Sequence, residues 1–200
     1  TRTQDPLELR VSSVGRALPD VEVKIVDIES GESLAHGEQG ELCTRGYLVM
    51  KGYYQMPEAT ACAIDSDGWL HTGDLAVMDE QGYCKITGRI KNMIIRGGEN
   101  IYPREIEEFL YRHPKISDVQ VYGVPDTKYG EQVMAAVKLK DGEKCTADEI
   151  RVFCQGEIAR YKIPRYVKFV DSYPMTASGK VQIFKLREQA IDDLKLLTSN

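Results

Sequence analysis

The sequence predicts an α+β chain in two parts, a small β-barrel or sandwich in residues 1–88 and an α+β domain in residues 93–200. Three observations carry this prediction. Short apolar segments separated by glycine-containing turns fill the first part, which is typical of strands. Helical and strand patterns alternate in the second part, so we expect a central, roughly three-stranded sheet flanked by helices. The charge also changes, from 7 basic and 15 acidic side chains in residues 1–88 to 19 basic and 16 acidic ones in residues 89–200.

The first part is expected to hold four strands and one short helix. Residues 21–28 alternate in part between apolar and polar side chains, and residues 41–45 form another short apolar strand before a glycine. A brief helix begins at Pro57, because proline suits the first helical turn. Residues 75–79 and 83–87 then form a hairpin around the glycine-containing turn between them.

The second part begins with an apolar pair at residues 94–95 and an amphipathic helix over 103–112. Two strands follow, over 119–124 and 132–139. A second helix is predicted over 146–159, since Thr146 and Glu149 have the spacing of a capping box. The last elements are a strand over 166–170, a loop over 174–179 and a helix over 185–196.

Composition excludes several classes of protein. Apolar residues make up 42% of the chain, and 17 Gly and 8 Pro are close to average usage, which disfavours disordered, collagen-like and coiled-coil chains. The net charge of −5 disfavours nucleic-acid binding. Neither a bilayer-length apolar run nor a signal peptide is visible. The five cysteines have neither disulfide nor metal-site spacing, so we expect no metal site and a reducing, cytoplasmic location.

Two segments carry side chains suited to a nucleotide. In residues 68–74, Asp74 follows a glycine turn, where a carboxylate can accept hydrogen bonds from a ribose diol; an Asx-turn or strand cap is the alternative. Residues 88–103 form the junction between the parts. There Gly97 and Gly98 allow close backbone approach beside the basic residues Arg89, Lys91 and Arg96; an ordinary linker is the alternative.

A third segment, residues 174–180, ends on Lys180 after a Ser-Gly turn. A lysine at such a tip can meet phosphate or carboxylate oxygens as a point charge. The spacing differs from that of a Walker loop, because no glycine stands five residues before Gly179 and Val181 follows the lysine. An ordinary surface turn is the alternative.

Taken in order, these segments resemble the second half of the adenylate-forming enzymes, which include acyl-CoA synthetases, nonribosomal adenylation domains and firefly-type luciferases. The resemblance spans residues 14–194. The run 97–103, Gly-Gly-Glu-Asn-Ile-Tyr-Pro, is similar to the fatty-acyl-CoA synthetase branch, nearest to medium-chain enzymes. The matching segments are residues 69–74, 88–89, 97–107, 113–114, 123–126, 130–131 and 178–180.

This resemblance implies roles for single residues. Asp74 is expected to hold the ribose hydroxyls of ATP and of the acyl-adenylate, with Arg89 assisting. Lys91 matches the hinge position, within a hinge at 89–92. Lys180 matches the catalytic lysine that contacts the substrate carboxylate and the α-phosphate during adenylation.

The resemblance also implies a fold and partners. Residues 1–88 become the distorted β-barrel that ends a large AMP-binding domain, and residues 93–200 a mobile C-terminal lid domain. Gly97 and Gly98 would line the channel for the CoA thiol. The phosphate-binding loop, the acyl pocket and the Mg²⁺ ligand belong to an upstream N-terminal domain, so we expect no adenylation by these 200 residues alone.

The implied activity is that of an acid–thiol ligase, an AMP-forming fatty-acyl-CoA synthetase that uses ATP, Mg²⁺ and CoA. A CoA ligase for a non-fatty carboxylate is one alternative. A non-catalytic nucleotide- or CoA-binding module is another, from a different class. A transit peptide upstream would change the expected location from the cytoplasm to the mitochondrial matrix.

Overall fold

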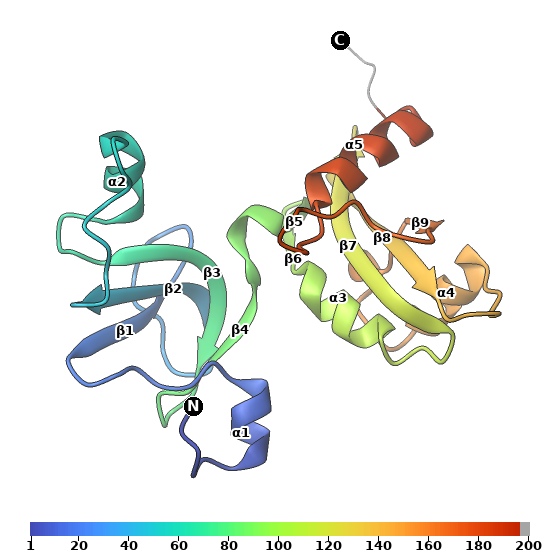
Figure 1. The fold of residues 1–200 in the computed structure, drawn as a ribbon. Helices are drawn as coiled ribbons and strands as arrows, with labels where there is room; N and C mark the ends of the chain where they lie inside the picture. Colours follow the sequence, from blue (N-terminus) through green and yellow to red (C-terminus); the bar gives the residue numbers. More distant parts are fainter. Residues whose placement is uncertain (197–200) are drawn as a thin grey trace. The chain divides into compact units, whose positions relative to one another are not determined.

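The computed structural model describes residues 1–196, and these form two compact units that divide between Lys91 and Asn92 (Figure 1). The division falls inside the segment 89–92, where the charge and the secondary-structure pattern of the sequence change. A short 3₁₀ turn, Ile90–Asn92, occupies this point. Each unit is described by itself below.

The first unit is built on an antiparallel sheet of four strands in the order β1-β2-β3-β4. The strands are β1 (Val21–Val26), β2 (Gln39–Gly46), β3 (Leu70–Met78) and β4 (Cys84–Arg89). The helix predicted at Pro57 is confirmed as α2 (Pro57–Ala63). Helix α1 (Leu7–Ser12) was not predicted; it has six residues, and none of them is buried.

The small distorted β-barrel expected for this unit takes the form of an open four-stranded sheet and does not close. Closure needs a pairing between β1 and β4, and neither strand makes it. Part of the free edge of β4 is taken instead by the segment that leads into β1, where the Val14 N–H donates to the Cys84 carbonyl at 2.8 Å and the Cys84 N–H to the Gly15 carbonyl at 2.9 Å. An edge covered in this way is not available to β1.

The second unit holds a five-stranded sheet rather than the three strands expected. Its strands are β5 (Ile94–Arg96), β6 (Glu99–Ile101), β7 (Ile116–Asp126), β8 (Gly130–Leu139) and β9 (Tyr166–Phe169). The path β6-β5-β8-β7 is antiparallel, and β9 pairs with β8 in parallel. The extra hairpin, β5 and β6, escaped prediction because each strand has only three residues.

Helices cover both faces of this sheet (Figure 1). Helices α3 (Pro103–Leu110) and α4 (Ala147–Cys154) pack on one face, where Ile106, Leu110 and Ile150 are almost fully buried. Helix α5 (Ile183–Leu194) packs on the other face through Leu186 and Ala190. The central strands therefore bury side chains on both sides, which explains their nearly continuous apolar sequence.

The ends of α4 show what the sequence fixes and what it does not. The capping box is confirmed: Thr146 Oγ1 accepts from the Glu149 N–H, and the Glu149 carboxylate accepts from the Thr146 N–H. The helix nevertheless ends at Cys154, five residues before the predicted end at residue 159. The C-cap residue Gln155 is already extended, with a φ of −67° and a ψ of 125°, and Gly156 follows with a φ of +82°.

All five cysteines are free thiols, as their spacing indicated. Within residues 1–196, no helix combines the length and the apolar character that crossing a bilayer requires.

Helix α3 carries one partly buried acidic side chain, that of Glu107. Glu107 Oε1 accepts a hydrogen bond from the Val121 N–H of β7 at 2.8 Å. Burial raises the pKa of Glu107, and the nearby Asp118 carboxylate acts in the same direction, while the hydrogen bond from Val121 opposes the shift. The folded state therefore holds the Glu107 proton to a higher pH than the unfolded state does.

This shift predicts a pH dependence of stability. A carboxyl whose pKa is higher in the folded state favours folding at low pH, and that contribution is lost as the pH rises through the folded pKa. Replacing Glu107 by Gln removes the titration and keeps a carbonyl for the Val121 N–H. The free energy of unfolding of Glu107→Gln, minus that of the parent chain, should therefore increase between about pH 4 and about pH 8 in urea titrations.

The matched control is Glu108→Gln, on the exposed face of the same helix. Its difference from the parent should change much less over that range. If the Glu107→Gln and parent curves run parallel from acid to neutral pH, the burial of the Glu107 carboxylate has no consequence for stability.

Candidate functional site

Asp74 lies in a bulge of β3. Glu41 and Cys43, two residues apart on β2, pair with Leu75 and His71, four residues apart on β3. Three residues of β3, 72–74, thus lie between these two pairs, where a regular ladder would hold only one. Gly73, in the middle of this stretch, has a φ of +70°. Bulges bend a strand and re-aim its side chains. The Thr-Gly-Asp sequence is what such a bulge requires, because glycine adopts a positive φ without steric cost.

The structure brings Asp74 and Arg89 together. They are register partners on β3 and β4, and Arg89 Nε lies 2.8 Å from Asp74 Oδ1. The Asp74 side chain remains 26% exposed and that of Arg89 56% exposed. The Asp74 N–H donates to Thr72 Oγ1 at 3.1 Å, which keeps the backbone of the bulge in place. A carboxylate held by an arginine, with access to solvent, is able to accept hydrogen bonds from a diol.

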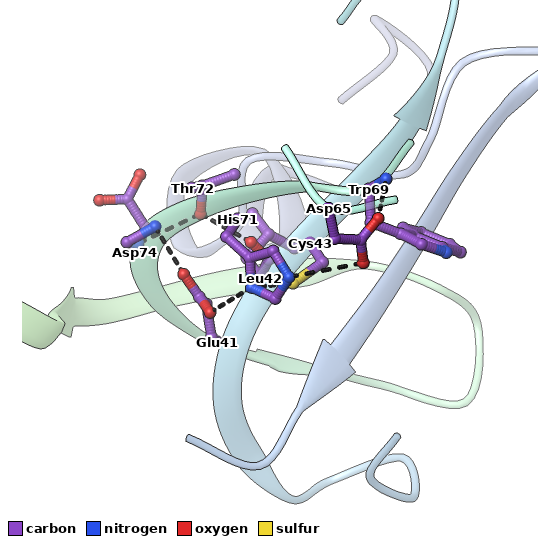
Figure 2. A network of polar contacts seen from close by, with 9 residues as sticks. Glu41, Leu42, Cys43, Asp65, Trp69, His71, Thr72 and Asp74 are labelled. Carbon is purple, nitrogen blue, oxygen red and sulfur yellow. Dashed lines mark hydrogen bonds and ion pairs between the residues drawn. The ribbon is translucent and has the colours of Figure 1, made fainter. Parts of the chain in front are cut away.

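A polar network holds the bulge from the side of β2. Glu41 Oε1 accepts the Gly73 N–H at 2.9 Å, and Glu41 Oε2 lies 2.8 Å from His71 Nδ1. The Cys43 Sγ lies 3.4 Å from the same nitrogen, and Asp65 Oδ2 lies 3.7 Å from His71 Nε2. Figure 2 shows that the Asp74 carboxylate points away from this network. The network therefore shapes the segment that carries Asp74 without occupying its carboxylate.

Burial governs the protonation of the thiol in this network. Cys43 is fully buried, and its burial, with the Glu41 carboxylate beside it, raises the pKa of the thiol to about 12. A thiol with this pKa is protonated at neutral pH and is a poor nucleophile.

Gly97 and Gly98 form the turn between β5 and β6. Both have positive φ, +62° and +87°, which is the requirement of a two-residue type I′ hairpin turn. A Cβ on Gly97 would lie 3.2 Å from the Tyr129 ring, whereas a Cβ on Gly98 would meet nothing within 4 Å. The second unit itself therefore leaves the space beside Gly98 open, and the channel role expected for it stays a prediction.

Lys180 lies at the end of a tight turn. The Thr176 N–H donates to the Lys180 carbonyl at 2.8 Å, and the Lys180 N–H donates to Thr176 Oγ1 at 3.0 Å. Gly179, with a φ of +79°, completes the turn. The Lys180 side chain is exposed and forms no ion pair with any residue in the part of the chain that the structure describes.

Lys91 is also exposed, on the 3₁₀ turn at the division between the units.

The second unit contains an arginine-rich groove of about 790 Å³, of whose arginines the sequence motifs included only Arg96. Of its arginines, Arg151 pairs with Asp148. No carboxylate lies within ion-pair distance of the other three in residues 1–196, so the groove has an excess of positive charge. Arg96 stacks over Tyr129 and donates to Gln132 Oε1 at 2.7 Å. The arginine and tyrosine side chains that line the groove are Arg96, Arg151, Arg160, Arg165, Tyr129 and Tyr161.

Such a groove is chemically suited to a phosphorylated ligand with an aromatic base. Guanidinium groups bind phosphate oxygens through paired hydrogen bonds, and tyrosine rings stack on bases. Its arginines come from β5, α4 and the segment 160–165, which are far apart in the sequence. The signals for it in the sequence were the net positive charge of the second part and Arg96 beside the two glycines of the 88–103 segment.

Two family models match the chain. The model described as AMP-binding enzyme matches residues 1–54, and the model described as AMP-binding enzyme C-terminal domain matches residues 105–180.

Curated relatives agree with these models. A putative acyl-CoA synthetase, YngI of Bacillus subtilis, is 62% identical over 199 residues, which are 100% of this chain and 36% of that protein. The mitochondrial medium-chain acyl-CoA ligase ACSF2 of Homo sapiens is 52% identical over 193 residues, 96% of this chain and 31% of that protein. The chain thus spans about a third of the length of the curated relatives it matches.

Solved structures give the same result for the fold. ATP-bound MatB from Rhodopseudomonas palustris has a TM-score of 0.87 and 39% identity, covering 91% of this chain and 36% of that one. The o-succinylbenzoate CoA synthetase MenE from Bacillus subtilis, in complex with its acyl-adenylate intermediate, has a TM-score of 0.77 and 35% identity, covering 90% and 36%.

One glycine near the groove has a testable packing role. A Cβ on Gly123 of β7 would lie 2.8 Å from Glu131 Oε1. That carboxylate accepts the Ile95 N–H at 3.0 Å and a hydrogen bond from Arg187 Nη2 at 2.8 Å, and so joins β8 to β5 and α5. Glycine at this position leaves room for the Glu131 side chain.

We therefore expect Gly123→Ala to displace Glu131 and to lower the free energy of unfolding by about 1–3 kcal/mol, measured by urea titration. Gly88→Ala on β4 is the matched control, because its Cβ would make an ordinary 3.9 Å contact with Leu75. Equal stability of the two variants would mean that Gly123 has no such role.

Proposed function

Because the chain belongs to the adenylate-forming superfamily of AMP-binding acyl-CoA synthetases, we propose that it is the C-terminal portion of an ATP-dependent, AMP-forming fatty-acyl-CoA synthetase. The observation that carries this proposal is the ion pair between Asp74, in the bulge of β3, and Arg89 of β4. It occurs in a chain that is similar to proteins named acyl-CoA ligases. The reaction has two steps: a carboxylate attacks the α-phosphate of ATP and releases pyrophosphate, and the CoA thiol then displaces AMP from the acyl-adenylate.

The ribose of the nucleotide is assigned to Asp74. Its carboxylate accepts hydrogen bonds from the two ribose hydroxyls, and the ion pair with Arg89 keeps it oriented. The bulge and the Glu41 network fix the backbone around it, so little ordering is needed when the nucleotide binds.

Lys180 is assigned to the first step. Negative charge grows on the non-bridging oxygens of the α-phosphate as the carboxylate attacks, and an ammonium group placed there stabilises it. An exposed side chain on a tight turn, without an internal ion pair in the described residues, is free to reach the reacting atoms. Lys91 serves as the hinge that lets the second unit present Lys180 in one step and Gly97 and Gly98 in the next.

The arginine-rich groove is assigned to CoA. The nucleotide end of CoA carries a 3′-phosphate, a diphosphate and an adenine ring, which match four arginines, three of them without an ion pair in residues 1–196, beside two tyrosines. Mg²⁺ accompanies ATP in this proposal, and its ligand is expected in the upstream domain together with the phosphate loop and the acyl pocket.

Fatty acid is the proposed substrate because the ACSF2 relatives are named medium-chain acyl-CoA ligases. A CoA ligase for a non-fatty carboxylate is the second candidate, favoured by the likeness to the o-succinylbenzoate enzyme.

We assign the protein to the cytoplasm, with the mitochondrial matrix as the alternative, since YngI is bacterial and the ACSF2 relatives are named mitochondrial.

The role of Lys180 is tested in the full-length protein by measuring the two half-reactions separately. Lys180→Ala should lower the rate of acyl-adenylate formation by about 100- to 1,000-fold, because one charge-stabilising group is removed. Thioester formation from preformed acyl-adenylate should stay nearly unchanged. Lys185→Ala, an exposed lysine on α5, is the control and should leave both rates unaltered. Equal losses in both half-reactions would contradict the assignment.

The role of the groove is tested by comparing CoA with 3′-dephospho-CoA in the thioester step. Arg160→Gln or Arg165→Gln should raise the KM for CoA by about tenfold, the loss expected for one charge-assisted hydrogen bond. For dephospho-CoA the change should be smaller, and adenylation should not change. Arg112→Gln, at the end of α3, is the control. A KM for CoA that is the same in all variants would remove CoA from the groove.

A further inference from the structure

We propose that Glu41, Cys43 and His71 form a binding site for one divalent metal ion of the zinc type. The donor atoms are Glu41 Oε2, Cys43 Sγ and His71 Nδ1, which all lie within 4.8 Å of one another. This inference does not depend on the proposed function, because it rests only on the geometry of β2 and β3.

The backbone brings the three side chains to one face. Cys43 and His71 are direct register partners on antiparallel strands, and Glu41 lies two residues before Cys43 on β2. Residues i and i+2 of a strand project to the same face, and directly opposed residues project together. The three donors therefore converge although Cys43 and His71 are 28 residues apart in the sequence.

The distances are close to those of a tetrahedral zinc site. Zinc bonds of about 2.0 Å to nitrogen and oxygen and about 2.3 Å to sulfur place neighbouring ligand atoms about 3.3–3.8 Å apart. The Cys43 Sγ and His71 Nδ1 atoms are already 3.4 Å apart. Glu41 Oε2, 2.8 Å from Nδ1, has to move by about half an ångström, and Oε1 can keep its bond from the Gly73 N–H.

A second carboxylate supports the histidine from behind. Asp65 Oδ2 lies 3.7 Å from His71 Nε2, on the side of the ring away from the donor atom Nδ1. Asp65 Oδ1 is fixed by the N–H groups of Trp69, at 2.8 Å, and Asp67, at 3.0 Å. Histidines that bind metals commonly direct their other nitrogen to a carboxylate, which sets the tautomer and the ring orientation. Figure 2 shows this arrangement of Asp65, His71, Cys43 and Glu41.

Access and charge also fit the site. Cys43 is fully buried, but His71 is 33% exposed, so an ion enters beside the imidazole and keeps a water as fourth ligand. Binding displaces the thiol proton of Cys43 to solvent, and the resulting thiolate and the Glu41 carboxylate neutralise the two charges of the ion. The mixed nitrogen, sulfur and oxygen donors favour zinc over magnesium or calcium, which prefer oxygen alone.

The experiment uses the tag-free chain titrated with Co²⁺, a spectroscopic substitute for Zn²⁺. The parent chain should show a thiolate-to-cobalt charge-transfer band that saturates at one equivalent and is abolished by Zn²⁺. Cys43→Ser and His71→Gln should lose the band, whereas the control Cys62→Ser, which removes an exposed thiol, should keep it. Absence of the band in the parent, or its survival in Cys43→Ser, overturns the proposal.

Asp65→Asn tests the supporting carboxylate and keeps the oxygen that caps Trp69 and Asp67. It should weaken Zn²⁺ binding by about 10- to 100-fold in competition with a chelator. Circular dichroism reports the folding of each variant; if Cys43→Ser does not fold, His71→Gln decides by the same criterion. Unchanged Zn²⁺ affinity in Asp65→Asn together with binding by His71→Gln would show that the ion is held elsewhere.

Discussion

The antiparallel ladder between β7 and β8 is the constraint on which the second unit depends. Its register runs from the pair Ile116 and Leu139 to the pair Asp126 and Gly130. Because side chains alternate along each strand, one face of the ladder carries Val119, Val121 and Val133 into the core with α3 and α4, and the other carries Tyr122, Val124 and Met134 into the core with α5. A shift by one residue would exchange these faces. The same register positions Glu131 and Gln132, which hold β5 and Arg96 at the groove.

In the first unit, the candidate site is formed where the ladder between β2 and β3 is interrupted. Between Glu41 and Cys43 of β2 the partner strand holds two extra residues, and the resulting bulge presents Asp74 beside Arg89. The Glu41 carboxylate stabilises this departure from regular geometry through the Gly73 N–H. A binding side chain needs a fixed position, and the backbone around Asp74 is held by part-buried polar contacts from the neighbouring strand. One network therefore serves both the proposed ribose site and the proposed metal site.

Local sequence patterns predicted most of the helices and strands of this molecule. The features that they did not predict depend on contacts between segments that are distant in the sequence. Features that depend on residues close in sequence could be predicted: the capping box at Thr146, the helix at Pro57 and the apolar strands of the second part. Features that depend on which distant segments pair could not be predicted: the open edge of the first sheet, the parallel pairing of β9 with β8 and the arginine-rich groove. Cysteine spacing likewise gave no sign that Cys43 and His71 face each other.

We propose that the protein carrying this chain makes acyl-CoA through an acyl-adenylate, and a single-turnover reaction tests this route. The full-length protein is mixed with a medium-chain fatty acid, CoA and ATP labelled in the α-phosphate, and the products are followed in time. Labelled acyl-adenylate should appear first and decay into equal amounts of AMP and acyl-CoA. Labelled ADP as the product, or acyl-CoA formed without the adenylate, would contradict it.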